Sequence, residues 1–324
     1  MNGMRRRRFF LTLAGATASV ARPPLAGADG EASTVVLCRH ERLRRIQDDL
    51  DRDLARNFLD RALRVITGAA DGPAAWRRLF APGERVGLKL SCLAGRPLSS
   101  SRGLVAAIVS GLRSAGVKPG HITIWDRSDR ELRNAGFAIG DDPVHVFGTD
   151  HLTGGGYSAR VEIHRSVGTC FSRIMERVDA LISVPVLKDH DIAGVSIGLK
   201  NFYGAIHNPN KFHGNRCDPY VADLCDHPLI RAKLRLTVCD ASRVQVHNGP
   251  AFFPRYAWEY GGILVSRDAV ALDDAGWRII ETRRRELGMQ SLHAEGRRPT
   301  YIERAAALGL GRSGEGAVRF VELG

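Results

Sequence analysis

Short apolar runs alternate with amphipathic helical segments along most of this 324-residue chain. The apolar runs end at glycine, proline or polar residues and predict strands, whereas the longer segments repeat apolar residues every three or four positions and predict helices. The predicted strands cover residues 34–38, 85–90, 121–125, 144–147, 180–184, 234–239 and 262–265. The predicted helices cover residues 48–67, 101–115, 131–135 and 268–286. This recurrence predicts an α/β fold in which a largely parallel sheet is covered by helices on both faces, with loop insertions.

The first 28 residues have the pattern of a targeting segment. Four arginines at positions 5–8 precede an apolar stretch at 9–20, which is too short to span a bilayer, and residues 26–28 (Ala-Gly-Ala) fit a cleavage site. Residues 7–11 (Arg-Arg-Phe-Phe-Leu) match the twin-arginine arrangement. We therefore expect a twin-arginine signal peptide over residues 1–28, recognition by the twin-arginine export machinery, and a periplasmic or otherwise exported protein. A general secretory signal, or a cytosolic chain with a basic tail, is the alternative.

The remaining residues, 29–324, predict a single α/β domain. Hydrophobic residues make up 44% of the chain, and neither an internal repeat nor a Pro/Ser-rich linker divides it. No stretch in this part is long and apolar enough to predict a membrane helix, so we expect no integral membrane segment in the mature chain.

The charge pattern argues against a nucleic-acid partner. The formal net charge is +12, but five of the arginines lie in residues 1–28, and acidic residues are interleaved with the others. No motif combines basic and aromatic residues in the way that nucleic-acid grooves or single strands require. A basic cleft would still attract a small anionic ligand.

The segment 181–220 carries the densest group of reactive side chains. Lys188 and His190 follow the predicted strand 180–184, which Pro185 is expected to end, and Lys200-Asn201 follows a Gly/Ser-spaced apolar segment. An ordinary solvated loop would also explain such residues, since Asn-Pro-Asn at 208–210 is common turn chemistry. Two features of this segment, its order and its content, argue for more than a loop.

The residues Val-Pro-Val-Leu-Lys-Asp-His at 184–190, then Gly-Val-Ser-Ile-Gly-Leu-Lys-Asn-Phe-Tyr-Gly at 194–204, then a histidine-bearing loop, resemble the signature of the domain-of-unknown-function family 362. The resemblance runs from about residue 86 to residue 272 and implies a family, not a reaction. Some members carry an added segment of closely spaced cysteines that binds a cluster. The six cysteines of this chain include no Cys-x-x-Cys pair, which argues against a ferredoxin-type iron–sulfur cluster.

Ionisable residues recur where predicted strands end, and in a parallel sheet these ends share one edge. We therefore expect a cleft there. Its predicted catalytic residues are Lys188, His190 and Asp240, and its predicted ligand-binding residues are Lys89, Asp126, Lys200 and Asn201. An aspartate after a strand can instead cap the next helix.

A divalent metal is a candidate cofactor, with His190, His207, His213 and Cys217 as predicted ligands. The spacing matches neither a zinc finger nor H-E-x-x-H, and histidines in polar loops often make plain hydrogen bonds instead. A disulfide between Cys217 and Cys225 is a further alternative in an oxidising compartment.

Two functions fit these residues. The first is an exported enzyme, redox or metal-assisted, that acts on a small anionic substrate at the C-terminal edge of the sheet. The second is a non-catalytic periplasmic accessory protein that binds an anion or a metal. The chain has no G-x-S-x-G, P-loop or G-x-G-x-x-G after a strand, so Lys188 is left either as a base or as a cation that holds the anion.

Overall fold

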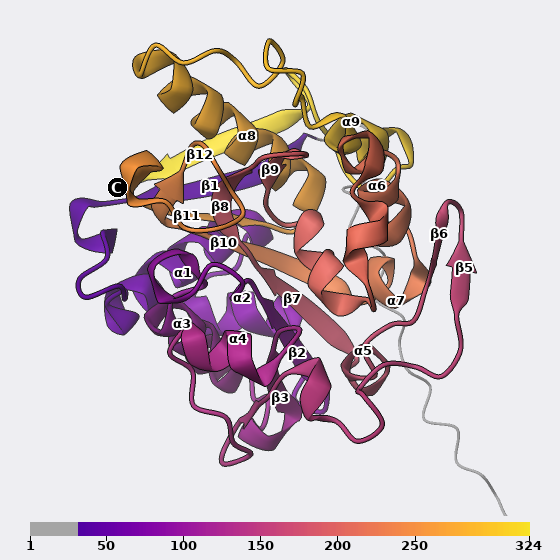
Figure 1. Ribbon diagram of the computed structural model, residues 1–324. Helices are drawn as coiled ribbons and strands as arrows, with labels where there is room; N and C mark the ends of the chain where they lie inside the picture. The colour runs from indigo at the N-terminus through magenta and orange to yellow at the C-terminus, as the bar shows by residue number, and fades with distance from the viewer. Residues whose placement is uncertain (1–31) are drawn as a thin grey trace, which may run out of the picture.

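The computed structural model describes residues 32–324 and is organised around one ten-stranded sheet (Figure 1). Eight strands follow each other across the sheet in the order β12-β1-β11-β10-β7-β2-β3-β4, and β8 and β9 extend it beside β10. These strands are β1 (Ser33–Arg39), β2 (Val86–Leu90), β3 (Ile122–Trp125), β4 (His145–Val146), β7 (Ala180–Val184), β8 (Val186–His190), β9 (Gly194–Ser196), β10 (Leu234–Gln245), β11 (Ala257–Ser266) and β12 (Val318–Leu323). The predicted signal peptide at 1–28 lies outside the described residues.

Most strand pairs are parallel. β10, β7, β2, β3 and β4 run in the same direction, and β12 is parallel to β1, whereas β11 is antiparallel to both of its neighbours. The carboxyl ends of β2, β3 and β7 therefore lie on one edge, as the predicted α/β fold requires. The structure confirms a largely parallel sheet with helices on both faces.

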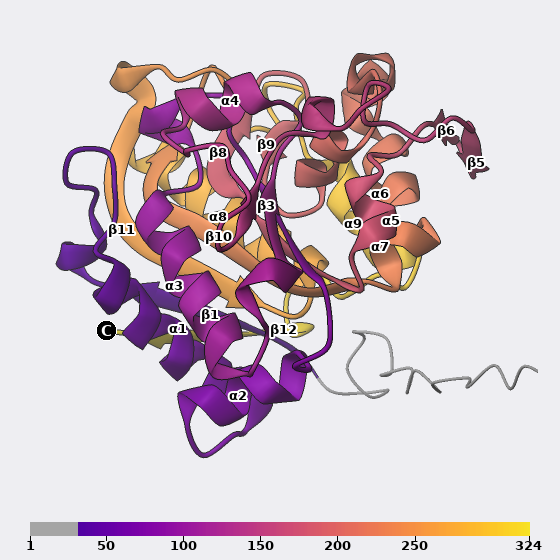
Figure 2. The same cartoon turned by 90° about the horizontal axis from the view of Figure 1, so that it is seen from below.

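Two hydrophobic cores lie on opposite faces of the sheet. One core packs α1 (Arg52–Thr67), α2 (Gly72–Leu79) and α3 (Arg102–Ser114) against it, and the other packs α6 (Tyr220–Cys225), α8 (Ala269–Glu286) and α9 (Thr300–Ala307). Figures 1 and 2 show these two groups of helices on either side of the strands. The shorter helices are α4 (Asp129–Asn134), α5 (Ile174–Arg177) and α7 (Pro228–Arg231).

Helix α1 illustrates how the sequence fixes its boundaries. The Asp51 carboxylate accepts hydrogen bonds from the backbone N–H groups of Asp53 and Leu54, both at 2.9 Å, so the helix begins after this cap and not at residue 48. It ends at Gly68, which adopts the left-handed conformation (φ 66°) that glycine tolerates.

Pro185 interrupts a strand without ending it. β7 stops at Val184 as predicted, but a second strand, β8, starts at Val186 and contains Lys188, Asp189 and His190, which were expected to follow the strand and not to lie in one. β8 pairs with both β10 and β9. Because side chains alternate along a strand, Lys188 and His190 point to one side and Asp189 to the other.

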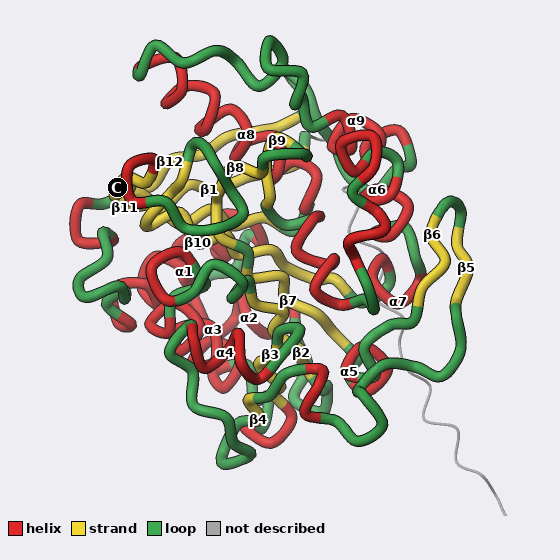
Figure 3. The backbone as a smooth tube through the Cα atoms, in the orientation of Figure 1, coloured by secondary structure: helices red, strands yellow, loops and turns green. Residues whose placement is uncertain are grey.

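A two-stranded insertion projects from the body of the molecule. The short hairpin of β5 (Glu162–His164) and β6 (Val167–Thr169) stands out from the molecule in both ribbon views, and Figure 3 shows loops joining it to the body. None of the helices within residues 32–324 combines the length and the apolar character needed to cross a bilayer.

Candidate functional site

A polar cavity of about 190 Å3 opens at the carboxyl edge of the sheet. We call it the lysine cavity. Its walls come from the ends of β2, β3 and β8 and from the turns at 200–213. It is lined by Lys89, Ser91, Cys92, Leu93, Asp126, Arg127, Glu131, Lys188, His190, Ser196, Lys200, Asn201, Tyr203, Gly204, Pro209, Asn210, His213 and Pro250.

Lys89 forms the floor of the cavity together with Asp126. The Lys89 ammonium donates to Asp126 Oδ1 at 2.6 Å, to the Leu90 carbonyl at 2.6 Å and to Asn201 Oδ1 at 3.3 Å. The other oxygen of Asp126 accepts from the Cys92 N–H at 2.7 Å. Gly204 approaches this pair so closely that an added Cβ would lie 2.6 Å from the Lys89 ammonium. Lys89 and Asp126 thus neutralise each other, and the chain can lie this close to them at position 204 only because that residue is a glycine.

Asn201 ties the turn 200–205 to the sheet. Its amide nitrogen donates to the Lys89 carbonyl at 2.9 Å and to Ser183 Oγ at 3.0 Å, while its oxygen faces the Lys89 ammonium. The turn therefore presents Lys200 at a fixed position. Behind it, the fully buried Asp273 carboxyl accepts from the N–H groups of Gly198 at 2.7 Å and Leu199 at 3.1 Å.

Lys188 and Lys200 are buried cations that have no counterion among residues 32–324. Lys188 donates to the Pro250 carbonyl at 3.4 Å, and Lys200 lies 3.1 Å from His213 Nε2 and 4.4 Å from the centre of the Tyr203 ring. Within residues 32–324, no carboxylate oxygen lies within 4.0 Å of either ammonium. Burial lowers the pKa of each lysine from 10.5 to about 8.

The two histidines of the cavity are stacked and neutral. The rings of His190 and His213 lie 5.4 Å apart at 27°. Burial and the nearby Lys200 lower the pKa of His190 to about 2, and the same two causes lower the pKa of His213. His213 Nδ1 lies 3.2 Å from the Pro209 carbonyl, which can only accept, so Nδ1 carries the proton and Nε2 accepts from Lys200.

His190 makes its contacts to backbone through Nδ1. This atom accepts from the N–H groups of Ile192 at 3.2 Å and Ala193 at 3.4 Å, and the exposed Asp191 carboxylate lies 3.0 Å from it. Beside the Lys89–Asp126 pair, the cavity therefore holds two further ammonium groups, Lys188 and Lys200, and two neutral imidazoles.

The structure brings together six of the seven residues predicted for the cleft. Lys89, Asp126, Lys188, His190, Lys200 and Asn201 all line the lysine cavity. Asp240 does not, and the expectation that it shares this cleft is corrected. β10 continues to Gln245, so Asp240 lies inside the strand and not at its end.

The Asp240 carboxylate belongs to a separate buried cluster. It pairs with Arg45 at 3.0 Å and accepts from the Ser101 N–H at 2.9 Å and from the Ser242 N–H at 3.1 Å. Burial alone would raise the pKa of this carboxyl, but the Arg45 guanidinium and these hydrogen bonds hold it below its usual value. The carboxylate has no oxygen left to face a ligand.

The predicted metal ligands are not gathered at one point. His190 and His213 share the cavity, but His207 is exposed against the Tyr157 ring, because its backbone N–H donates to the Cys170 carbonyl and Phe171 bridges Ile206. Cys217 is buried in the core, where burial raises the pKa of its thiol. Within residues 32–324, no group of three or more His, Cys, Asp or Glu side chains is placed to hold a metal ion. Cys217 and Cys225 are both free thiols, so the alternative disulfide is not formed.

Several lining residues were not predicted. Cys92 and Tyr203 carry a weak signal, since Cys92 lies two residues after β2 and Tyr203 three residues after Lys200. Arg127 and Glu131, one turn apart on the chain, form an ion pair at the rim. Pro250 enters from a distant loop, and no local pattern indicates it.

Comparisons with solved structures give two distant similarities. The chain is similar to the lactate racemase apoprotein from Thermoanaerobacterium thermosaccharolyticum, with 13% identity, a TM-score of 0.43 and coverage of 74% of this chain and 55% of the other. It is also similar to a protein from Thermotoga maritima, with 12% identity, a TM-score of 0.35 and coverage of 61% and 52%. The chain thus spans about half the length of each of these proteins. A comparison with curated protein sequences finds no significant match.

The family comparison is more extensive. Residues 86–278, more than half of the chain, match the family described as Domain of unknown function (DUF362). The matched segment contains the six cavity residues predicted from sequence and the 184–204 motif that carried the resemblance. The chain therefore belongs to the DUF362 family.

Proposed function

We propose that this protein is an enzyme that binds a small anionic substrate in the lysine cavity and moves a proton on it. The observation that carries the proposal is the pair of buried ammonium groups, Lys188 and Lys200, that lack a carboxylate partner within residues 32–324. A buried charge is costly unless it is paired. A bound carboxylate or phosphate would supply the missing negative charge.

The other charges of the cavity do not fill this role. Asp126 is held by Lys89, and Glu131 pairs with Arg127. The cavity therefore keeps two positive charges in excess, at a pH where both lysines are still largely protonated. This excess favours an anion over a neutral ligand.

The size of the cavity limits the substrate. Its volume of about 190 Å3 lies below the ~300–1,000 Å3 of pockets that hold drug-sized ligands. We infer a small carboxylate or phosphate, held by the lysines at one end.

Lys200 and His213 are arranged for proton transfer. A lysine with a pKa of about 8 can both give and accept a proton near neutral pH. His213 Nε2 accepts a hydrogen bond from the Lys200 ammonium at 3.1 Å and so orients it, and the neutral His190 ring stacks beside His213. We therefore assign Lys200 as the acid–base group and Lys188 as the group that holds the anion.

The experiment measures binding and proton transfer separately. Isothermal titration with inorganic phosphate and a panel of small carboxylates tests binding, and proton NMR in D2O tests exchange or conversion of each compound. We expect a binder that exchanges or turns over in the wild type, no exchange in Lys200→Met, and at least tenfold weaker binding in Lys188→Met. Lys118→Met, which changes an exposed lysine, is the matched control.

The outcomes separate the two functions predicted from sequence. Binding without exchange or conversion of any compound would favour the non-catalytic anion-binding protein. Absence of binding for the whole panel would contradict both.

Export is a separate part of the proposal and rests on residues 7–11 alone. Replacing Arg7 and Arg8 by lysine should retain the full-length precursor in the cytoplasm, because the twin-arginine route reads this pair and a general secretory signal needs only positive charge. Fractionation followed by immunoblotting measures this, and normal release of a shortened form would refute the route.

A further inference from the structure

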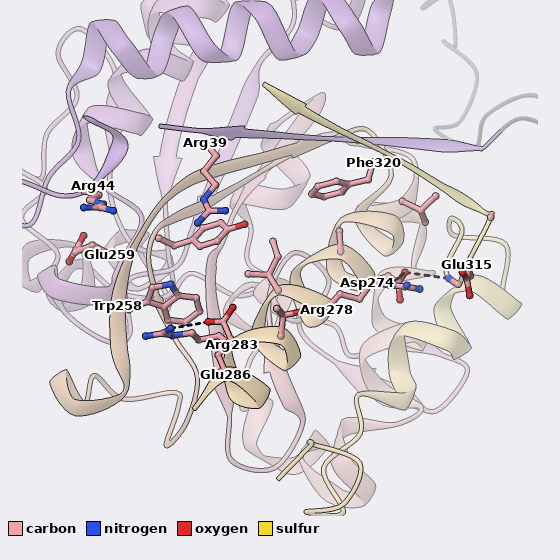
Figure 4. Close-up of a pocket in the computed structure, with 17 residues that line it drawn as sticks. Arg39, Arg44, Trp258, Glu259, Asp274, Arg278, Arg283, Glu286, Glu315 and Phe320 are labelled. Carbon is pink, nitrogen blue, oxygen red and sulfur yellow. Dashed lines mark hydrogen bonds and ion pairs between the residues drawn. The ribbon is translucent and has the colours of Figure 1, made fainter. Parts of the chain in front are cut away.

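A second, larger cavity of about 590 Å3 lies between helix α8 and the strands β1, β11 and β12 (Figure 4). We call it the arginine–aromatic cavity. It has no lining residue in common with the lysine cavity. It is lined by Arg39, Arg44, Trp258, Glu259, Tyr260, Asp274, Ala275, Arg278, Ile279, Thr282, Arg283, Glu286, Gly314, Glu315, Gly316, Val318 and Phe320.

The cavity exists because α8 is covered unevenly. From Ala269 to Gly276 every residue of the helix is buried, but in the rest of the helix only Ile280 and Arg284 are. Ala275, Ile279, Thr282, Arg283 and Glu286 recur at helical spacing along one stripe that faces the cavity. This stripe is left without a covering element at the edge of the sheet.

Aromatic rings form two walls. Trp258 and Tyr260 are two residues apart on β11 and so share one face, with ring centres 5.9 Å apart at 76°. Phe320 lies on β12 and is 46% exposed. Figure 4 shows Trp258 and Phe320 at different ends of the cavity, with Trp258 on the side of Arg39 and Arg44. Trp258 and Tyr260 are half-buried, and the Arg283 guanidinium lies 5.6 Å from the centre of the Trp258 ring, so the open face of that ring is the stacking surface for a planar group.

Two arginines of this cavity have no counterion in residues 32–324, and both are exposed. Arg278 pairs with Asp274 at 3.1 Å and Arg283 with Glu286 at 2.9 Å. In the described part of the chain, Arg39 and Arg44 have no carboxylate oxygen within 4.0 Å. The Arg39 guanidinium instead lies 4.5 Å from the centre of the Tyr260 ring.

The two arginines and the acidic residue Glu315 lie at opposite ends of the cavity. Figure 4 shows Arg39 and Arg44 on the side of Trp258, and Glu315 on the opposite side beyond Arg278. Glu259, which lies near Arg44 in the lining, is paired with Arg243. The region around Trp258 therefore combines an aromatic surface with two guanidinium groups that remain available to an anion.

We propose that the arginine–aromatic cavity binds a planar aromatic ligand that carries a phosphate or carboxylate group. The ring stacks against Trp258, and the anionic group pairs with Arg39 and Arg44, which lie at the same end of the cavity. The volume of about 590 Å3 is within the ~300–1,000 Å3 range of pockets that enclose such ligands. This site is independent of the anion proposed for the lysine cavity.

The test uses three probes that separate ring from charge: flavin mononucleotide has both, riboflavin has the ring without the phosphate, and inorganic phosphate has the charge alone. Adenosine monophosphate serves as a second planar anion. Isothermal titration of the full-length chain should show flavin mononucleotide or adenosine monophosphate binding, and riboflavin at least tenfold weaker than its phosphate. Trp258→Leu should weaken the binding of flavin mononucleotide and of riboflavin by at least tenfold. Arg39→Gln should weaken the binding of the phosphorylated compounds and leave the affinity for riboflavin unchanged.

Two controls make the result specific. Arg319→Gln removes an exposed arginine next to Phe320 on β12 that does not line the cavity, and should leave all affinities unchanged. Lys188→Met with Lys200→Met should abolish any phosphate binding in the lysine cavity without changing the affinity for flavin mononucleotide. The proposal is overturned if neither planar anion binds, or if Arg39→Gln and Arg319→Gln have equal effects.

Discussion

The lysine cavity and the Arg45–Asp240 cluster are both charged, both buried and both close to β8 and β10, but only the cluster is satisfied internally. Asp240 has a guanidinium at 3.0 Å and hydrogen bonds from Ser101 and Ser242. Lys188 and Lys200 have no carboxylate partner among residues 32–324. The fold completes the charge of one region and leaves the other to be completed by a ligand, which is how a stabilising cluster differs from a binding site.

Removal of Arg45 should produce the largest effect. Arg45→Met leaves the Asp240 carboxylate fully buried without its cation, and breaking a buried ion pair in this way costs about 3–5 kcal/mol of unfolding free energy. Urea unfolding measures the loss, and Arg45→Lys, which keeps the charge, should recover part of it. Ordinary surface substitutions change the free energy of unfolding by less than about 1 kcal/mol. If the free energy of unfolding of Arg45→Met differs from that of the wild type by no more than this, the contrast between the two regions fails.

Removal of Lys200 should act in the opposite direction. Because the folded state lowers the pKa of Lys200 from 10.5 to about 8, its ammonium destabilises the empty protein, and Lys200→Met should stabilise it by about 1–3 kcal/mol at pH 7. The advantage should be complete below pH 8 and gone above pH 10.5, where the lysine is neutral in both states.

Urea unfolding of Lys200→Met at pH 7 and at higher pH, beside Lys118→Met, provides the measurement. A variant that is clearly less stable than the wild type at pH 7 would mean that Lys200 has a stabilising partner in the protein. The cavity would then be a structural cluster like that of Asp240.

Much of the lysine cavity was predictable because it follows from strand direction. Lys89 and Asp126 lie at the ends of parallel strands, and such ends meet on one edge whatever the loops do. Lys188 and His190 were placed at the correct edge of the sheet. Their strand, β8, was missed because a proline in the sequence cannot show whether a strand resumes after it.

The incorrect site predictions concern residues whose positions depend on pairing between segments that are distant in sequence. β10 runs past Cys239 because β11 pairs with it through Ala257–Ser266, so Asp240 became a residue inside the strand. His207 is carried away from His190 by a bridge between Phe171 and Ile206. The arginine–aromatic cavity joins Arg39, Trp258 and Phe320, which are far apart in sequence and form no local pattern.

Asp273 extends the comparison to two aspartates that are equally buried. Arg45 helps to hold the pKa of Asp240 below its usual value. Asp273 has no paired cation among residues 32–324, and burial raises its pKa from 3.8 to about 8, although the hydrogen bonds from two N–H groups lower it. Between pH 4 and pH 8 the folded state therefore holds a proton on Asp273 that the unfolded chain has already released. Stability from this group should be complete below pH 4 and lost as the pH rises through 8.

Asp273→Asn should therefore match the wild type at pH 4 and exceed it at pH 9 by at least about 2 kcal/mol, because the pKa shift exceeds one unit and each unit is worth about 1.4 kcal/mol. Thermal melts at both pH values test this. Since Asp273 also holds the N–H groups that lead to Lys200, the same variant should weaken anion binding.

An exposed ion pair gives the lower limit of the comparison. Arg85 and Asp179 form a two-point contact, with distances of 2.7 and 3.0 Å, where β2 and β7 begin, but their side chains are 54% and 41% exposed. Solvent already compensates charges at this exposure, so the pair should be worth only about 0.2–1 kcal/mol in a double-mutant cycle with Arg85→Ala and Asp179→Ala. The coupling should also shrink in high salt, because exposed charges are screened whereas the Arg45–Asp240 pair is not. A coupling here as large as that of the buried pair would show that burial is not what separates the satisfied cluster from the surface, and the argument that the lysine cavity needs a ligand would lose its physical basis.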